Sequence, residues 1–127
     1  MPTEKIAALL DDWSAALASG DADQIADLYA PDAVLLPTAS YQIRLEPGQI
    51  RRYFRDIMQR TPSARFMEVH SRRFDTVGIN SGIYTFKMHR DDGTPFELVC
   101  RFTFVYLLFD GVWKIIEHHS SIMPDQL

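Results

Sequence analysis

The sequence predicts a single α+β domain spanning residues 1–127, in which helices pack on one face of a curved antiparallel sheet. Apolar residues in the first half recur at helical spacing, whereas the second half consists of long alternating segments separated by turn signals. The 127 residues are 46% hydrophobic and 24% charged, an ordinary globular composition that is sufficient for one core. No linker, repeat or low-complexity segment divides the chain.

Three helices are predicted in the first half. Gly20 is placed to end the first helix, and Asp21 with Gln24 forms a capping pair for a short second helix that ends near Pro31. The third helix begins at Pro47, because proline suits the first turn of a helix. The first helix is marked by apolar residues at steps of three and four, namely Ile6, Leu9, Leu10, Trp13 and Leu17. The third has a similar stripe, made of Ile50, Tyr53, Phe54, Ile57 and Met58.

A brief apolar strand at 33–36 and four long strands make up the predicted sheet. The turn at 91–93 separates two long strands, since Gly93 supplies the left-handed conformation of a hairpin turn, and Asp110-Gly111 separates the last two. We therefore expect a four- to six-stranded antiparallel sheet. The predicted long strands are 66–77, 80–90, 96–109 and 112–123.

The strand at 96–109 is apolar on both faces. Its even-numbered residues, Phe102 among them, would meet the helices, which leaves the odd-numbered side in water unless a partner covers it. We expect a homodimer formed sheet to sheet, or a larger even-numbered oligomer. A charge in such a face is usually paired, so Arg101 is expected to pair with Glu117 on the neighbouring strand. The predicted interface residues are Arg101, Thr103, Val105, Glu117 and His119.

Charge and cysteine content exclude several classes of function. The formal net charge is −4, from 13 basic and 17 acidic residues, so nucleic acid is not an expected partner. A single cysteine, Cys100, excludes an intrachain disulfide and a cysteine-based zinc cage. The start lacks a signal-peptide pattern, and no apolar run approaches the ~20 residues that span a bilayer. We therefore expect a cytoplasmic protein without membrane contact.

Two adjacent histidines, His118 and His119, could suggest a metal site. Successive side chains of a strand point to opposite faces, so the two would not share one ion, and neither face supplies three convergent ligands locally. We predict no metal site and no cofactor. Ser120 shares a face with His118, but residues two apart on a flat strand lack the exposed elbow of a nucleophilic serine.

Motifs along nearly the whole chain resemble one known family. They are similar to nuclear-transport-factor-2-like domains, the SnoaL-like and ketosteroid-isomerase-like superfamily, and most of all to the association domain of calcium/calmodulin-dependent protein kinase II and its stand-alone bacterial relatives. This resemblance implies a bent antiparallel sheet wrapped around three helices, a cavity at the open end, and assembly as dimers or rings of dimers. The motifs are Trp13, Gly20-Asp21, the run 28–38, Tyr53-Phe54, Gly82 to Phe86, Arg101 to Tyr106, Asp110 to Trp113 and the run 115–124.

The resemblance also locates a cavity wall. The family's ligand-holding histidine and arginines match Ile50, Tyr84, Phe104 and Ser120 here, none of which is basic, so an apolar and aromatic cavity is expected. It would suit a flat, largely apolar small molecule. The alternative, that these aromatic side chains simply fill the core, stays open. Alternation also places Ile116 on the face of His118. The predicted lining is Trp13, Tyr41, Ile50, Phe54, Tyr84, Phe86, Phe104, Tyr106, His118 and Ser120.

Two functions remain open at this point. In one, the domain is a small-molecule-binding or oligomerisation module. In the other it is an isomerase, cyclase or oxidoreductase of an aromatic or polycyclic substrate, with His118 as acid–base and Tyr84 or Tyr106 orienting an oxygen. The steroid-isomerase mechanism itself is disfavoured, because the stretch 34–38 has no carboxylate base and Trp13 stands where that mechanism needs a tyrosine.

Overall fold

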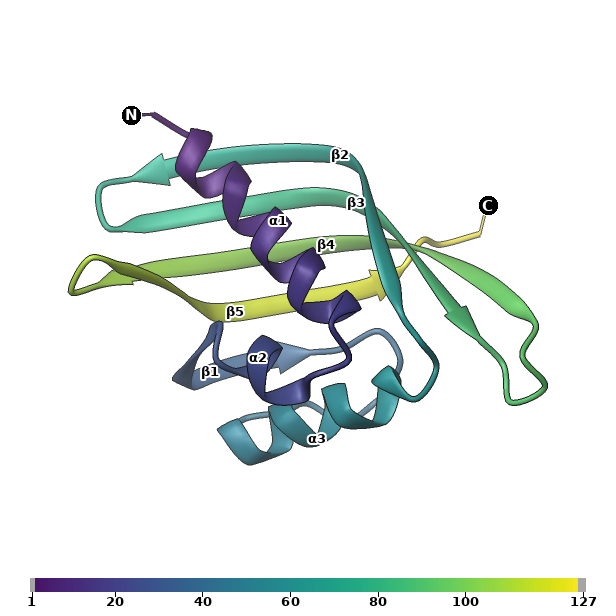
Figure 1. The fold of residues 1–127 in the computed structure, drawn as a ribbon. Helices are drawn as coiled ribbons and strands as arrows, with labels where there is room; N and C mark the ends of the chain where they lie inside the picture. The colour runs from purple at the N-terminus through teal and green to yellow at the C-terminus, as the bar shows by residue number, and fades with distance from the viewer. Residues whose placement is uncertain (1, 126–127) are drawn as a thin grey trace.

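A computed structural model describes residues 2–125, and it confirms an α+β domain with three helices and a five-stranded sheet. The strands lie in the order β1-β5-β4-β3-β2, and α1 runs diagonally across one face of the sheet, while α2 and α3 lie near the β1 edge (Figure 1). The elements are α1 (Glu4–Ala18), α2 (Ala22–Ala26), β1 (Tyr29–Leu36), α3 (Pro47–Met58), β2 (Ser63–Phe74), β3 (Val77–His89), β4 (Pro95–Phe109) and β5 (Val112–Ile122).

Three predicted helix boundaries are confirmed, at Gly20, Asp21 and Pro47. Gly20 follows the C-cap of α1 with φ of 77°, a conformation that glycine adopts without strain. The carboxylate of Asp21 accepts hydrogen bonds from the backbone N–H groups of Asp23 (3.0 Å) and Gln24 (3.4 Å), which caps α2. Pro47 is the first residue of α3.

The first strand departs from the prediction in extent and direction. The second helix ends at Ala26 instead of continuing toward Pro31, and β1 begins already at Tyr29. Pro31 is tolerated because β1 is an edge strand, where a missing N–H breaks no ladder on the open side. The sheet is mixed, since β1 pairs in parallel with β5. Most of the chain separates these two strands, so no hairpin turn imposes an antiparallel direction on them.

A bulge in β5 changes which residues face the helices. Val105 stands opposite Glu117, whereas Tyr106 stands opposite Ile115, so Ile116 is an extra residue between the two pairs. Ile115 is therefore buried in the core, and the prediction that Ile116 shares the face of His118 is wrong. Strict alternation fails at the bulge because one added residue reverses the direction of every side chain beyond it.

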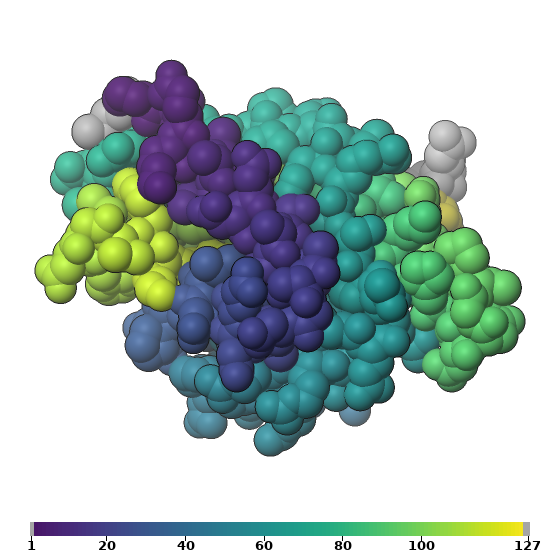
Figure 2. All heavy atoms as spheres, in the orientation of Figure 1, coloured from purple at the N-terminus to yellow at the C-terminus, as the bar shows by residue number. Residues whose placement is uncertain are grey.

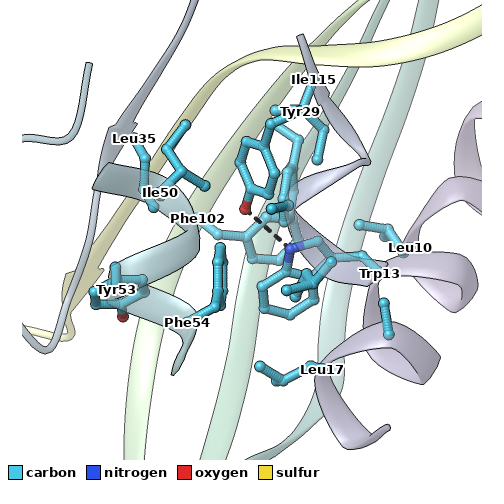
Figure 3. Packing of buried hydrophobic residues seen from close by; sticks show 14 of the residues in the cluster. Leu10, Trp13, Leu17, Tyr29, Leu35, Ile50, Tyr53, Phe54, Phe102 and Ile115 are labelled. Carbon is cyan, nitrogen blue, oxygen red and sulfur yellow. Dashed lines mark hydrogen bonds between the residues drawn. The ribbon is translucent and has the colours of Figure 1, made fainter. Parts of the chain in front are cut away.

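The core lies between the helices and the sheet. Trp13 and Leu17 of α1 meet Tyr29 of β1 and Phe54 of α3 there, over the strands that carry Phe102 (Figure 3). In the space-filling view the three helices cover this face, and the β4–β5 hairpin forms one rim of the molecule (Figure 2). Among residues 2–125, no helix combines the length and hydropathy needed to cross a membrane. We call the helix-covered side of the sheet the inner face and the opposite side the outer face.

Candidate functional site

An aromatic cluster on the inner face surrounds Trp13. Its indole stacks on the ring of Tyr84 with centroids 6.0 Å apart and meets the rings of Phe104 and His118 edge-on at 5.3 and 5.6 Å. His118 in turn stacks on Phe104 at 3.9 Å. Trp13 lies on the side of α1 that faces the sheet, and its three neighbours lie on the helix-facing sides of three adjacent strands. One helix side chain therefore contacts all three strands.

The space enclosed by this cluster is almost filled. It leaves about 10 Å³ free, roughly the room that one water molecule needs. Six of the predicted lining residues border it, namely Trp13, Phe54, Tyr84, Phe86, His118 and Ser120. The structure adds five that the prediction did not include, Leu35, Pro37, Thr38, Tyr53 and Ile57. Tyr53 and Ile57 belong to the predicted apolar stripe of α3, a signal that could have identified them.

The other predicted lining residues lie elsewhere. Ile50 and Phe104 are in the core, with Phe104 beneath the imidazole of His118. Tyr106 lies beyond them and borders a separate hollow of about 300 Å³ between α1 and the β4–β5 hairpin. Tyr41 is fully exposed, so it does not line the cavity in this structure. Its loop is anchored by backbone hydrogen bonds between Leu35 and Arg44, which direct Arg44 inward over the ring of Tyr53 and leave Tyr41 outside.

A chain of hydrogen bonds begins at Trp13. The indole Nε1–H donates to the hydroxyl of Tyr29 over 3.1 Å (Figure 3). Indole nitrogen is a donor only, so the Tyr29 oxygen acts here as acceptor and its own proton is free to donate onward. The atom within reach is Nδ1 of His118, 2.8 Å away. The first donor therefore sets the direction of the second hydrogen bond.

The same logic continues through His118. With Nδ1 accepting from Tyr29, the proton of the neutral imidazole is on Nε2, which donates to the hydroxyl of Tyr84 at 3.2 Å. Tyr84 donates to Oγ of Ser120 at 2.6 Å, and Ser120 is hydrogen bonded to the hydroxyl of Thr38. We call this series from Trp13 to Thr38 the donor chain. It connects α1, β1, β5, β3 and the loop after β1 by side chains that each have a partner.

Burial determines the charge state of His118. The side chain is 2% exposed, and its burial lowers the pKa from 6.5 to about 3, with a smaller contribution from the neighbouring His119. Burial also raises the pKa of Tyr29 and of Tyr84 well above 10.0. All three groups are therefore neutral at neutral pH. Both ring nitrogens of His118 are occupied by tyrosine hydroxyls, an arrangement that holds the ring in place and leaves no lone pair for a substrate.

The adjacent histidines point to opposite sides of the sheet. His118 is buried on the inner face, and His119 is exposed on the outer face. Within residues 2–125, no group of three histidine, cysteine, aspartate or glutamate side chains is arranged to hold a metal ion.

The predicted interface residues share the outer face. Thr103 stands opposite His119, and Val105 opposite Glu117, while the intervening residues of β4 are buried. The predicted ion pair between Arg101 and Glu117 is wrong, because the register places Ser121 opposite Arg101. The apolar residues of this face, partly or fully exposed, are Val77, Ile79, Ile83, Val99, Val105, Leu107 and Ile116.

Comparisons with known proteins agree with this architecture. The family model of the calcium/calmodulin-dependent protein kinase II association domain matches residues 3–124. A solved structure from Xanthomonas campestris, described as such an association domain, is 42% identical, with a TM-score of 0.92 over 96% of this chain and 88% of that chain. No curated protein matches the sequence.

Two more distant solved structures share the fold. The hub of the S. rosetta kinase is 19% identical, with a TM-score of 0.79 over 97% of this chain and 98% of that chain. A Streptomyces avermitilis protein of the NTF2-like family, named for a dehydratase, is 16% identical, with a TM-score of 0.81 over 96% of this chain and 97% of that chain. At these identities the likeness concerns the fold and not the chemistry.

Proposed function

Since the chain belongs to the family of calcium/calmodulin-dependent protein kinase II association domains, we propose that it is a self-assembly module whose outer sheet face binds a second copy of itself. The observation that carries this proposal is the contrast between the space beside His118 on the inner face, which is almost filled, and the outer face, which is apolar yet uncovered. One solved neighbour is a kinase hub, which supports assembly as the use of this fold here.

The composition of the outer face supports burial against a partner. Ile79 of β3, Val105 of β4 and Val34 of β1 lie in one row across the strands, interrupted only by Glu117. Adjacent apolar side chains on a regular sheet form the kind of contiguous patch that monomeric proteins rarely leave in water. Two such faces pack about 10 Å apart when sheets stack.

The inner face provides less support for an enzymatic function. A catalytic acid–base at neutral pH needs a pKa near that pH and an open approach for the substrate. His118 has neither, because its pKa is lowered to about 3 and the space beside it holds about 10 Å³. These observations favour the assembly module over an isomerase, cyclase or oxidoreductase, and they assign the donor chain a structural role.

Light scattering coupled to size-exclusion chromatography tests the proposal at micromolar concentration. We expect the parent protein to be a dimer or a larger even-numbered oligomer. Val105→Arg places a charge in the apolar row and is expected to give monomers, because burying an unpaired charge is costly. Val69→Arg is the matched control, since Val69 is 38% exposed and lies with Leu10 of α1 on the other side of the sheet. A monomeric parent protein would contradict the proposal.

A further inference from the structure

Two opposite charges on the outer face lack an ion partner within the described chain. Arg101 is exposed on β4 and Glu117 is partly exposed on β5. The ion pairs formed among residues 2–125 involve other side chains. Glu117 stands between Val105 on one side and Val34 on the other. Covering this face would remove the carboxylate from water, a large cost unless a cation meets it.

The separation of the two charges follows from the register. Glu117 is opposite Val105, which is four residues along β4 from Arg101. At 3.3 Å per residue and about 5 Å between strands, the two Cα atoms are roughly 14 Å apart. Side chains at that distance on one sheet do not pair with each other, so neither charge has an ion partner among residues 2–125.

A two-fold axis supplies both partners at once. Consider an axis that lies between two stacked outer faces, perpendicular to the line from Arg101 to Glu117. Rotation about it places Arg101 over Glu117 of the partner subunit, and Glu117 over Arg101 of the partner subunit. Two-fold interfaces are reciprocal in this way, since each contact occurs twice. The axis passes between the opposed residues Thr103 and His119, midway between the two charges.

We propose that two copies of this chain pair through reciprocal Arg101–Glu117 ion pairs across a two-fold axis that crosses β4 and β5 near Thr103. This inference rests on the proposed self-assembly and specifies how the two subunits are aligned on each other. Because the line from Arg101 to Glu117 is inclined by about 20° to the strands, the strands of the two subunits cross at roughly 40°, which is close to the angle of about 30° found in many stacked sheets. Ile83 lies opposite Arg101 and Val105 lies opposite Glu117, and the burial of these side chains keeps water from the pairs.

A charge exchange tests the pairing. Arg101→Glu and Glu117→Arg each put like charges face to face at both positions, and each is expected to weaken the dimer on the order of 100-fold. The double variant, with both substitutions, restores opposite charges and is expected to return the dissociation constant to within about tenfold of the parent value. Arg52→Glu, an exposed charge reversal on α3, is the matched control and is expected to leave the dimer unchanged.

Sedimentation equilibrium gives the dissociation constants, and near-ultraviolet circular dichroism shows that each variant keeps its packed aromatic core. Recovery in the double variant supports the reciprocal pairs. A parent dimer whose single variants both weaken without recovery in the double variant overturns the register and leaves self-assembly standing. A parent dimer that neither single variant weakens overturns the pairing as well. A monomeric parent protein overturns the proposed function on which the inference rests.

Discussion

The two faces of the sheet accommodate their polar groups in different ways. On the inner face, the polar atoms near Trp13 form the donor chain, in which each group bonds to another group of the same subunit. On the outer face, Arg101 and Glu117 stand among apolar side chains and have no ion partner among residues 2–125. Polar groups that are paired within the subunit stabilise the fold, whereas charges that need partners on a second subunit favour association.

The largest expected difference between the faces is in stability. Trp13→Ala removes the side chain at the centre of the aromatic cluster and is expected to lower the free energy of unfolding by about 3–5 kcal/mol. Thr103→Ala on the outer face is expected to change it by no more than about 0.5 kcal/mol when both are measured in the Val105→Arg background, which is expected to be monomeric. Urea unfolding gives both values. Equal losses at the two positions would contradict the comparison.

A second prediction concerns the donor chain alone. Tyr29→Phe keeps the ring but leaves the indole N–H of Trp13 and Nδ1 of His118 without their common partner. We expect the free energy of unfolding to fall by roughly 2–3 kcal/mol, because two buried polar groups become unsatisfied. Tyr41→Phe removes the hydroxyl of a fully exposed tyrosine and is expected to have no effect. If Tyr29→Phe leaves the free energy of unfolding unchanged, the donor chain does not stabilise the inner face.

The smallest effect is a dependence of the stability on pH that arises from His118. The folded state keeps His118 neutral because burial lowers its pKa to about 3, whereas the unfolded chain takes up a proton below about 6.5. Its contribution to stability is therefore complete above pH 6.5 and declines as the pH falls toward 3. At 1.36 kcal/mol per unit, the loss between pH 8 and pH 5 is about 2 kcal/mol.

Urea unfolding at several pH values measures how the free energy of unfolding depends on pH. His118→Gln is expected to reduce this dependence, and Thr103→Ala, which removes no titratable group, is expected to preserve it. Nitrogen-15 spectra of the parent protein provide an independent reading that does not depend on how well His118→Gln folds. A ring of His118 that is protonated in the folded protein at pH 5 would contradict the prediction.

Local signals in the sequence predicted most of the fold. Gly20, Asp21 and Pro47 marked helix ends because their effects depend only on neighbouring residues, and the turn glycines marked the hairpins in the same way. The extent and direction of β1 could not be predicted, since both depend on pairing with a strand at the far end of the chain. The bulge at Ile116 is equally non-local, because it exists only relative to β4.

The candidate site was harder to predict than the fold. Alternation identified the side chains that face inward, but it carries no information on whether those side chains leave room between them. The exposed position of Tyr41 and the inward position of Arg44 follow from one backbone pairing with Leu35 that has no sequence signature. The second helix was expected to continue toward Pro31, a range that includes Tyr29, so the hydroxyl of Tyr29 could not be assigned to His118 in advance.

The donor-only indole at the head of the donor chain has an evolutionary consequence. Every later group is oriented by the one before it. An acceptor at position 13 would require the Tyr29 hydroxyl to donate to it, which would reverse the direction of each following hydrogen bond. Substitutions along this series are thus constrained to occur together. In relatives that replace Trp13 by a residue without a donor, we expect compensating changes at Tyr29 or His118, and comparison of aligned relatives would reveal these positions as a co-varying set.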